Sequence, residues 1–217
     1  MAGDETGEVW FFQNTGDQQK PRLLEGVLLK GGGKVIQGIA ARYEKSKTNT
    51  IYYLVPNKSE LMGKYSKIHV ADWDQDGLLD LLIGQDGPGN QKMVWYKNQG
   101  TKEKPELSAP QEIELASPKV VRPSPYVIDW DQDGRQDLLC GTEGSEIIFY
   151  RNKGTRERPV LAEGIPLQLE GNGYAEGVRA RLQVLDWNND GKLDLLIGNV
   201  YFQDNKSGGN LWLFLGQ

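Results

Sequence analysis

The sequence is poor in the residues on which many enzymes and small secreted scaffolds depend. It contains one cysteine, Cys140, and one histidine, His69. A single cysteine excludes an internal disulfide framework and a cysteine-based zinc site, and a single histidine disfavours histidine-dependent acid–base catalysis. No apolar run reaches about 18 residues, which excludes a membrane-spanning helix. Because Met1–Glu8 is polar and acidic, we expect no signal peptide in this chain.

What remains is the composition of a folded, soluble protein. Hydrophobic residues make up 38% and charged residues 25% of the 217 positions. The formal net charge of −5 is too acidic for a dedicated nucleic-acid-binding protein, so we expect no nucleic-acid partner. The 27 glycines and 10 prolines predict many turns between short elements.

Two sequence elements recur along the chain. Residues 72–84, 129–141 and 186–198 share the pattern Asp-Trp-Asp/Asn-x-Asp-Gly-x-x-Asp-Leu-Leu-x-Gly, and their starts are 57 residues apart both times. An aromatic run followed by Asn-x-Gly recurs at residues 10–16, 94–101 and 148–155, and the chain ends within a related run at 211–215. Such a fixed register indicates a repeat protein. We expect one repeat domain over residues 1–217, with a partial repeat at about 7–23, an insertion at about 24–67 and repeats at about 68–123, 124–180 and 181–217.

The pattern within each repeat favours β-structure. Short apolar runs at residues 126–128 and 182–185 lead into the Asp-rich segment, and residues 146–150 lead into the Asn-x-Gly turn. The apolar spacing of a helix is not sustained anywhere. About four short strands per unit of roughly 40–60 residues is typical of a β-propeller blade. We therefore predict an all-β fold, a β-propeller of about four blades or partial blades, each with about four antiparallel strands.

The Asp-rich segment has the form of a loop that surrounds one hard cation. Odd positions 1, 3, 5 and 9 carry oxygen-bearing side chains, position 7 offers its carbonyl, and glycine at position 6 permits a sharp turn. An all-oxygen ligand set suits calcium and disfavours zinc or copper. We thus expect about three Ca²⁺ ions. The predicted ligands are Asp72, Asp74, Asp76, the Leu78 carbonyl and Asp80 in loop 1; Asp129, Asp131, Asp133, the Arg135 carbonyl and Asp137 in loop 2; and Asp186, Asn188, Asp190, the Lys192 carbonyl and Asp194 in loop 3.

Two other interpretations of these loops deserve comparison. An EF-hand has a glutamate at position 12, where this chain has Ile83, Cys140 and Ile197, and it needs flanking helices. The EF-hand interpretation therefore fails. Asp/Gly turns without a metal are the alternative, but clustered carboxylates repel one another unless a cation or a proton neutralises them.

These motifs resemble the FG-GAP/VCBS-type repeat of integrin-like β-propellers. The resemblance covers residues 70–217 well and residues 7–23 in part, and it leaves the insertion unexplained. It implies that the loops hold structural calcium and that ligands bind elsewhere on the propeller. Loop 3 departs from the pattern at position 3, where Asn188 replaces an aspartate; an amide is a tolerated ligand there but weakens the binding of the cation. Complete propellers of this kind have about six to eight blades, so the chain resembles an excerpt or one part of an assembly.

The insertion is basic in a chain that is acidic overall. Insertions of this kind map to loops on one face, often the binding face. Its basic residues are Lys30, Lys34, Arg42, Lys45, Lys47, Lys58, Lys64 and Lys67, against the acidic Glu25, Glu44 and Glu60. Among other residues, Trp73, Trp130 and Trp187 occupy position 2 of the loops and are expected to pack between blades, and Cys140 is expected to be a buried core thiol.

Three functions remain open at the level of sequence. The first is a non-enzymatic, calcium-stabilised module for binding or adhesion, extracellular or at the cell surface, with an anionic glycan or an acidic protein patch as partner. The second is a polysaccharide lyase-like domain, for which Tyr52, Tyr53 and the insertion lysines are the candidates. The third is a scaffold whose blades complete a propeller with another chain or as a homo-oligomer. Extracellular calcium, at about millimolar concentration, saturates even weak loops.

Overall fold

The fold is built from short β-strands. The computed structural model describes residues 1–4, 6–37, 42–45, 52–55, 64–86, 92–118, 120–169, 174, 177–203 and 206–216. Every element named in this part of the chain is a strand. None of the described residues forms a helix with the length and hydrophobicity of a membrane span. The prediction of an all-β fold is therefore confirmed.

Among the described residues, four sheets of three or four strands follow one another along the chain, and we call them units 1 to 4. Sequence neighbours within each unit pair antiparallel, as expected for strands joined by short turns. Unit 1 contains β1 (Ala2–Gly3), β2 (Val9–Phe11) and β3 (Val27–Leu28); unit 2 contains β8 (Lys64–Ala71), β9 (Asp80–Asp86), β10 (Lys92–Tyr96) and β11 (Gln111–Glu112); unit 3 contains β12 (Ser124–Ile128), β13 (Asp137–Gly141), β14 (Ile147–Tyr150) and β15 (Ile165–Pro166); unit 4 contains β16 (Val178–Leu185), β17 (Asp194–Gln203) and β18 (Lys206–Phe214).

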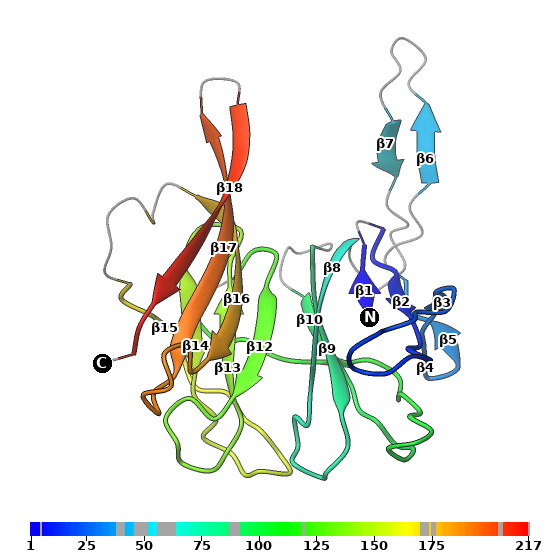
Figure 1. The fold of residues 1–217 in the computed structure, drawn as a ribbon, viewed down its shortest axis with the longest axis horizontal. Coiled ribbons are helices and arrows are strands. Elements are labelled where there is room, and N and C mark those ends of the chain that lie inside the picture. Colours follow the sequence, from blue (N-terminus) through cyan, green and yellow to red (C-terminus); the bar gives the residue numbers. More distant parts are fainter. Residues whose placement is uncertain are drawn as a thin grey trace.

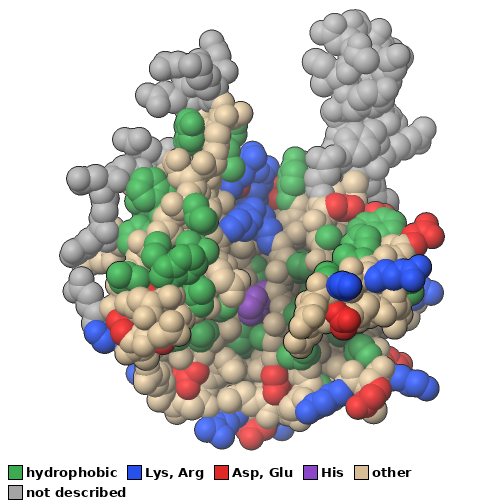
Figure 2. Space-filling model, viewed as in Figure 1, with side chains coloured by type: hydrophobic (Ala, Val, Ile, Leu, Met, Phe, Trp, Pro, Cys, Tyr) green, Lys and Arg blue, Asp and Glu red, His purple; other side chains and the backbone are tan. Residues whose placement is uncertain are grey.

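Two small hairpins lie between units 1 and 2. They consist of β4 (Lys30–Gly31) with β5 (Lys34–Val35), and of β6 (Arg42–Lys45) with β7 (Tyr52–Val55). The β6–β7 hairpin and the end of the β17–β18 hairpin project from the upper edge of the sheets, whereas the loops that follow β8, β12 and β16 lie along the lower edge (Figure 1). Figure 2 shows a hollow along the middle of this face, with Lys and Arg side chains at its upper end.

The strands β9 and β13 of units 2 and 3 are buried on both faces. Along β9 the side chains alternate, as a period of two requires. Leu81 and Ile83 pack in a core with Val9 of unit 1, whereas Leu82 packs in a second core with Leu138 of unit 3. This explains why the Asp-Leu-Leu-x-Gly runs of units 2 and 3 are apolar without a polar face, since each of these two sheets lies between two neighbours.

A second repeated feature is the Asn-x-Gly turn that precedes the last strand of units 1, 2 and 3. The Asn98 carboxamide oxygen accepts hydrogen bonds from the N–H groups of Gly100 and Glu106, both at 3.0 Å. The same pattern occurs at Asn14, with Gly16 and Arg22, and at Asn152, with Gly154 and Val160. Unit 1 therefore shares the turn of the complete repeats.

Neighbouring units approach one another most closely at a glycine of the Asp-Leu-Leu-x-Gly run. A Cβ atom at Gly84 would lie 1.9 Å from the carbonyl oxygen of Pro123, and one at Gly141 would lie 2.4 Å from that of Ala180. A Cβ atom at Gly3 would likewise lie 2.3 Å from the carbonyl oxygen of Ser66. At Gly198 of unit 4, by contrast, no atom lies within 4 Å of such a Cβ. Glycine therefore permits the stacking of unit on unit.

The tryptophans at loop position 2 are not equivalent in the structure. Trp73 is 3% exposed and Trp130 is partly buried, and each packs in a core between two units. The prediction that they pack between sheets is confirmed for these two. It is wrong for Trp187, which is 55% exposed because no described residue covers that face of unit 4. Cys140 is fully buried, as expected.

The predicted insertion is partly incorporated into the sheets. β3, at Val27–Leu28, pairs with β2 and so forms the third strand of unit 1. Lys67 lies in β8 and is buried. Lys47, Lys58 and Glu60 lie outside the described residues, and for Tyr52 and Tyr53 only the backbone is described. The idea that this segment is a binding loop stays a prediction.

Candidate metal centre

The three Asp-rich loops fold in the same way around their first aspartate. In loop 1 the Asp72 carboxylate accepts hydrogen bonds from the N–H groups of Asp76 and Gly77, at 3.0 and 2.9 Å. Asp76 in turn accepts the N–H of Leu78 at 2.9 Å. Gln75 at position 4 and Gly77 at position 6 both have positive φ, 52° and 91°, which winds the loop tightly. In loops 2 and 3 the equivalent backbone N–H groups donate to the carboxylates of Asp129, Asp133, Asp186 and Asp190.

The ninth-position aspartates hold the loop to the sheet. Asp137 is fully buried and accepts the N–H groups of Trp130, at 3.0 Å, and Asn152, at 2.7 Å. It thereby joins the loop to the turn after β14. Asp80 binds Trp73 and Asn98 in the same way, and Asp194 binds Trp187 and Gly216. Burial raises the pKa of Asp80 to about 6 and also raises the pKa of Asp137. Sequence reasoning assigned these residues to the metal alone and missed their two backbone bonds.

Two groups of carboxylates are close enough to share one ion. Ligand oxygens of Asp72, Asp74 and Asp76 lie within 4.8 Å of one another in loop 1. In loop 2 the corresponding group consists of Asp129, Asp131 and Asp137. Asp133 lies outside that group and instead contacts Arg135 and Arg151.

Loop 3 is more open. Asp186, Asn188 and Asp190 are all exposed, and the Asn188 amide donates to Asp190 at 3.1 Å. The N–H of Lys192 lowers the pKa of Asp190. Coordination by the carbonyls of Leu78, Arg135 and Lys192, and by loop 3 as a whole, stays a prediction.

Basic side chains accompany loops 1 and 2. Lys97 forms ion pairs with Asp74 and Asp76, 2.6 Å from the latter, and its hydrogen bond lowers the pKa of Asp76. At the equivalent position of unit 3, Arg151 Nε lies 2.6 Å from Asp131. Both residues directly precede the Asn of the Asn-x-Gly turn, and the corresponding residue in unit 4 is Leu215. A metal ion held by loop 1 or 2 would therefore share its carboxylates with a protein cation.

The donor set fits a hard divalent cation. All ligand atoms are oxygens, which calcium prefers. Asp74 is 4% exposed, and its Oδ1 atom is buried without any hydrogen-bond partner. A buried carboxylate oxygen without a partner is costly, and a cation within the cluster of Asp72, Asp74 and Asp76 would supply one.

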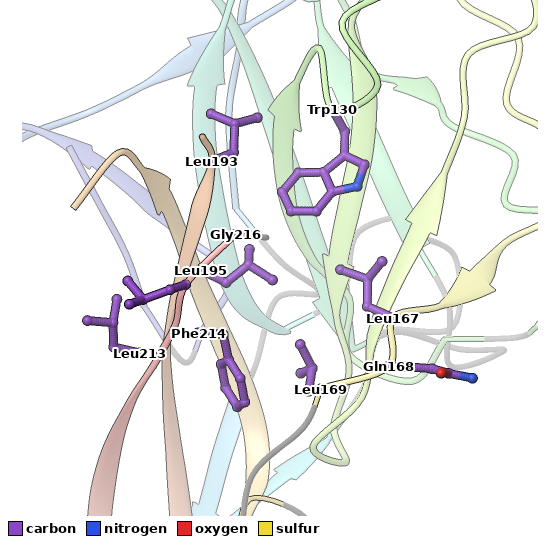
Figure 3. A pocket seen from close by; sticks show the side chains of 10 residues that line it. Trp130, Leu167, Gln168, Leu169, Leu193, Leu195, Leu213, Phe214 and Gly216 are labelled. Carbon is purple, nitrogen blue, oxygen red and sulfur yellow. The ribbon is translucent and has the colours of Figure 1, made fainter. Parts of the chain in front are cut away.

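Two pockets in the described part of the chain lie between neighbouring units. Figure 3 shows one of about 580 Å³, in which the Trp130 ring, Leu167 and Leu169 face Leu195 and Phe214 of unit 4. A pocket of about 550 Å³ lies between units 2 and 3 and is lined by the equivalent Trp73, Ile113 and Leu115, among others. Because equivalent residues line both, these pockets are gaps that recur where neighbouring sheets diverge.

Comparison with known proteins gives one match. The model of the FG-GAP-like repeat matches residues 72–140 and 129–197, which together span more than half of the chain. No curated protein and no solved structure matches the chain significantly.

Proposed function

The chain belongs to the FG-GAP-like repeat family, and we propose that it is a non-enzymatic binding module, part of a β-propeller whose Asp loops hold about three structural calcium ions. The orphaned, buried Oδ1 atom of Asp74 within a cluster of three aspartates carries this proposal. Calcium would neutralise the carboxylates and fix the end of each sheet, while partners bind elsewhere on the module.

The proposal also covers where the protein is located and what it binds. Loops that share their carboxylates with Lys97 and Arg151 bind calcium weakly, and weak loops are filled at the roughly millimolar calcium outside cells. We therefore place the protein outside the cell or at its surface, in adhesion or in the binding of an anionic glycan or an acidic protein. A lyase-like activity would depend on Tyr52 and Tyr53, whose side chains are outside the described part of the chain.

Thermal unfolding in calcium and in the chelator EGTA tests the calcium sites. Calcium at a hundredfold excess over its Kd should stabilise the fold by about 2.7 kcal/mol per site. Asp74→Asn should lose one such contribution, roughly 5–11 °C of the calcium-dependent rise in Tm. The exposed Glu103→Gln changes the charge equally and should keep the full rise. Identical melting of the unsubstituted protein in calcium and in EGTA would contradict structural calcium.

A second candidate function, a scaffold completed by a second copy of the chain, is favoured by the open face of unit 4. Leu211 is 71% exposed there, whereas the equivalent Met93 and Ile147 are fully buried by the next unit. Trp187 lies exposed and Gly198 uncontacted on this unit. In three earlier places in the chain the next unit covers the corresponding glycine, so the face continues a series of interfaces between like sheets.

The mass of the protein in solution, measured by light scattering coupled to size-exclusion chromatography, tests whether two copies of the chain assemble. We expect the protein to have the mass of a dimer and Leu211→Lys to have that of a monomer. Leu79→Lys, at an exposed leucine of loop 1, is the matched control and should remain dimeric. A monomeric mass for the unsubstituted protein over the whole concentration range would exclude the scaffold formed by two copies.

A further inference from the structure

The first strands of units 2, 3 and 4 are β8, β12 and β16. Near their starts, at the edge opposite the Asp loops, they carry a row of hydrogen-bond donors. Lys67 in β8, Ser124 in β12 and Arg181 in β16 are 57 residues apart and occupy the same position of the repeat. Lys67 is 8% exposed, and its amine donates to the carbonyl of Arg122 at 2.8 Å. The repeat thus brings an ammonium group, a hydroxyl group and a guanidinium group to one end of three neighbouring sheets.

A second row lies two residues earlier in each unit. Tyr65, Arg122 and Arg179 have φ values of 57°, 52° and 63°, a conformation that side chains other than glycine rarely adopt. Strained backbone of this kind concentrates at functional sites. The Arg122 guanidinium lies 4.8 Å from the centre of the Tyr65 ring, and that of Arg179 lies 5.9 Å from the centre of the Phe202 ring.

Positive charge exceeds negative charge in this group, which we call the basic cluster: Lys67, Arg122, Arg179 and Arg181. Asp86 accepts a bond from Arg122 at 2.9 Å, and Glu143 accepts bonds from Arg122 and Arg179, at 3.0 and 3.2 Å. The four cations therefore face two carboxylates. Within the described part of the chain, neither Lys67 nor Arg181 forms an ion pair with a carboxylate. Figure 2 shows Lys and Arg side chains gathered in the hollow at this edge.

We propose that the basic cluster is a binding site for the carboxylate group of an acidic sugar. This inference rests on the proposed binding function and names its ligand class and its place. Lys67 is buried and Arg181 is partly buried. A cation withdrawn from water without a counter-charge is costly, and a bound anion would supply that charge. The planar guanidinium of Arg181 suits the two oxygens of a carboxylate.

Aromatic rings beside the cluster favour a sugar over a free anion. Tyr65 is 38% exposed and Phe202 is 63% exposed. An exposed ring offers an apolar face to the C–H groups of a pyranose while the adjacent guanidinium binds the carboxylate. The site also differs from the predicted insertion, because Arg122 directly precedes unit 3, Arg179 and Arg181 lie in unit 4, and only Lys67 comes from residues 24–67.

Titration by NMR with methyl glucuronide, in calcium, tests the proposal. We expect saturable shifts of the amide signals at the starts of β8, β12 and β16, and none with the neutral methyl glucoside. Arg181→Gln and Lys67→Met should each raise the Kd about tenfold. Lys153→Met removes an exposed lysine outside the cluster and should leave the Kd unchanged. Far-UV circular dichroism verifies that each variant is folded.

Each other result rejects the proposal. Shifts with the glucoside equal to those with the glucuronide, or an equal loss of affinity in Lys153→Met, would remove the role of the cluster. Binding of a glucose sulfate or a glutamate-containing peptide without binding of the glucuronide would assign the cluster to another ligand. Because calcium-dependent melting tests the Asp loops separately, failure of this site is distinguishable from failure of the proposed calcium-stabilised module.

Dependence on pH provides a further readout. Burial, followed by repulsion from Arg181 and Arg122, lowers the pKa of Lys67 to about 7, against attraction from Glu143 and Asp86. A bound carboxylate favours the protonated amine, so affinity should be higher at pH 6 than at pH 8.5. His69, whose pKa burial lowers to about 4, stays neutral over this range. In Lys67→Met the difference in affinity should disappear, and its persistence would exclude Lys67 from the site.

Discussion

Replacing Gly141 with alanine is expected to destabilise the fold by at least about 3 kcal/mol. The new Cβ would lie 2.4 Å from the carbonyl oxygen of Ala180 in the next unit, a distance that real Cβ atoms do not reach. Because both groups belong to backbone in packed strands, relief requires that β13 and β16 separate and open the core between units 3 and 4. For a chain of this size, calorimetry should record a fall in Tm of roughly 6 °C or more.

The repeat supplies its own control. Gly198 occupies the same position of the motif in unit 4, but no atom lies within 4 Å of the point that a Cβ atom would occupy there. Gly198→Ala should therefore leave the Tm unchanged or raise it slightly, since glycine within a strand costs about 0.5–1 kcal/mol relative to alanine. Gly84→Ala, with Pro123 at 1.9 Å, should behave like Gly141→Ala. Equal losses at Gly141 and Gly198, at concentrations where the chain is monomeric, would show that close approach between units is not what requires glycine.

The contrast between these glycines illustrates what the sequence can and cannot reveal. The 57-residue period, the Asp loops and the all-β pattern are local, because each depends on spacing within one segment. Gly84, Gly141 and Gly198 occupy the same position of the motif, and the packing of the next sheet distinguishes them. The same reasoning applies to Trp187, whose loop matches that of Trp73 but whose face of the sheet is uncovered.

In the candidate sites, too, some features could be predicted from the sequence and others depend on the fold. The aspartates of each loop were identifiable from their spacing, and a basic residue before Asn98 and before Asn152 was visible in the repeat. That Lys97 reaches Asp74 depends on how the third strand returns to the loop. The basic cluster was not identifiable, because Lys67, Arg122 and the Arg179–Arg181 pair come from three segments about 55 residues apart that meet only when three sheets stand side by side.

Asp137→Ala should produce the second large effect, a loss of about 3–6 kcal/mol, and it separates the two roles of the ninth-position carboxylate. The substitution removes the acceptor of the Trp130 and Asn152 N–H groups, at 3.0 and 2.7 Å. Each hydrogen bond to a charged acceptor contributes about 1.5–3 kcal/mol. Since the bonds join the loop to the turn after β14 without any metal, the loss should appear in denaturant unfolding even with EGTA present. Asp137→Asn keeps one acceptor oxygen and should lose roughly half as much.

Asp131→Asn in the same loop is the matched comparison. Asp131 is exposed and its Oδ2 atom pairs with Arg151, an interaction that contributes no more than about 1 kcal/mol at a surface. In EGTA this variant should therefore unfold almost like the unsubstituted protein, and its larger deficit should appear only when calcium is added. If Asp137→Ala instead matched the unsubstituted protein in EGTA and lost stability only in calcium, its carboxylate would act as a metal ligand and not as the acceptor that fastens the loop to the sheet. The expected result would mean that the bonds of the ninth aspartate form without calcium. The carboxylates at the first and third positions of the loop would then contribute to stability mainly by binding the ion.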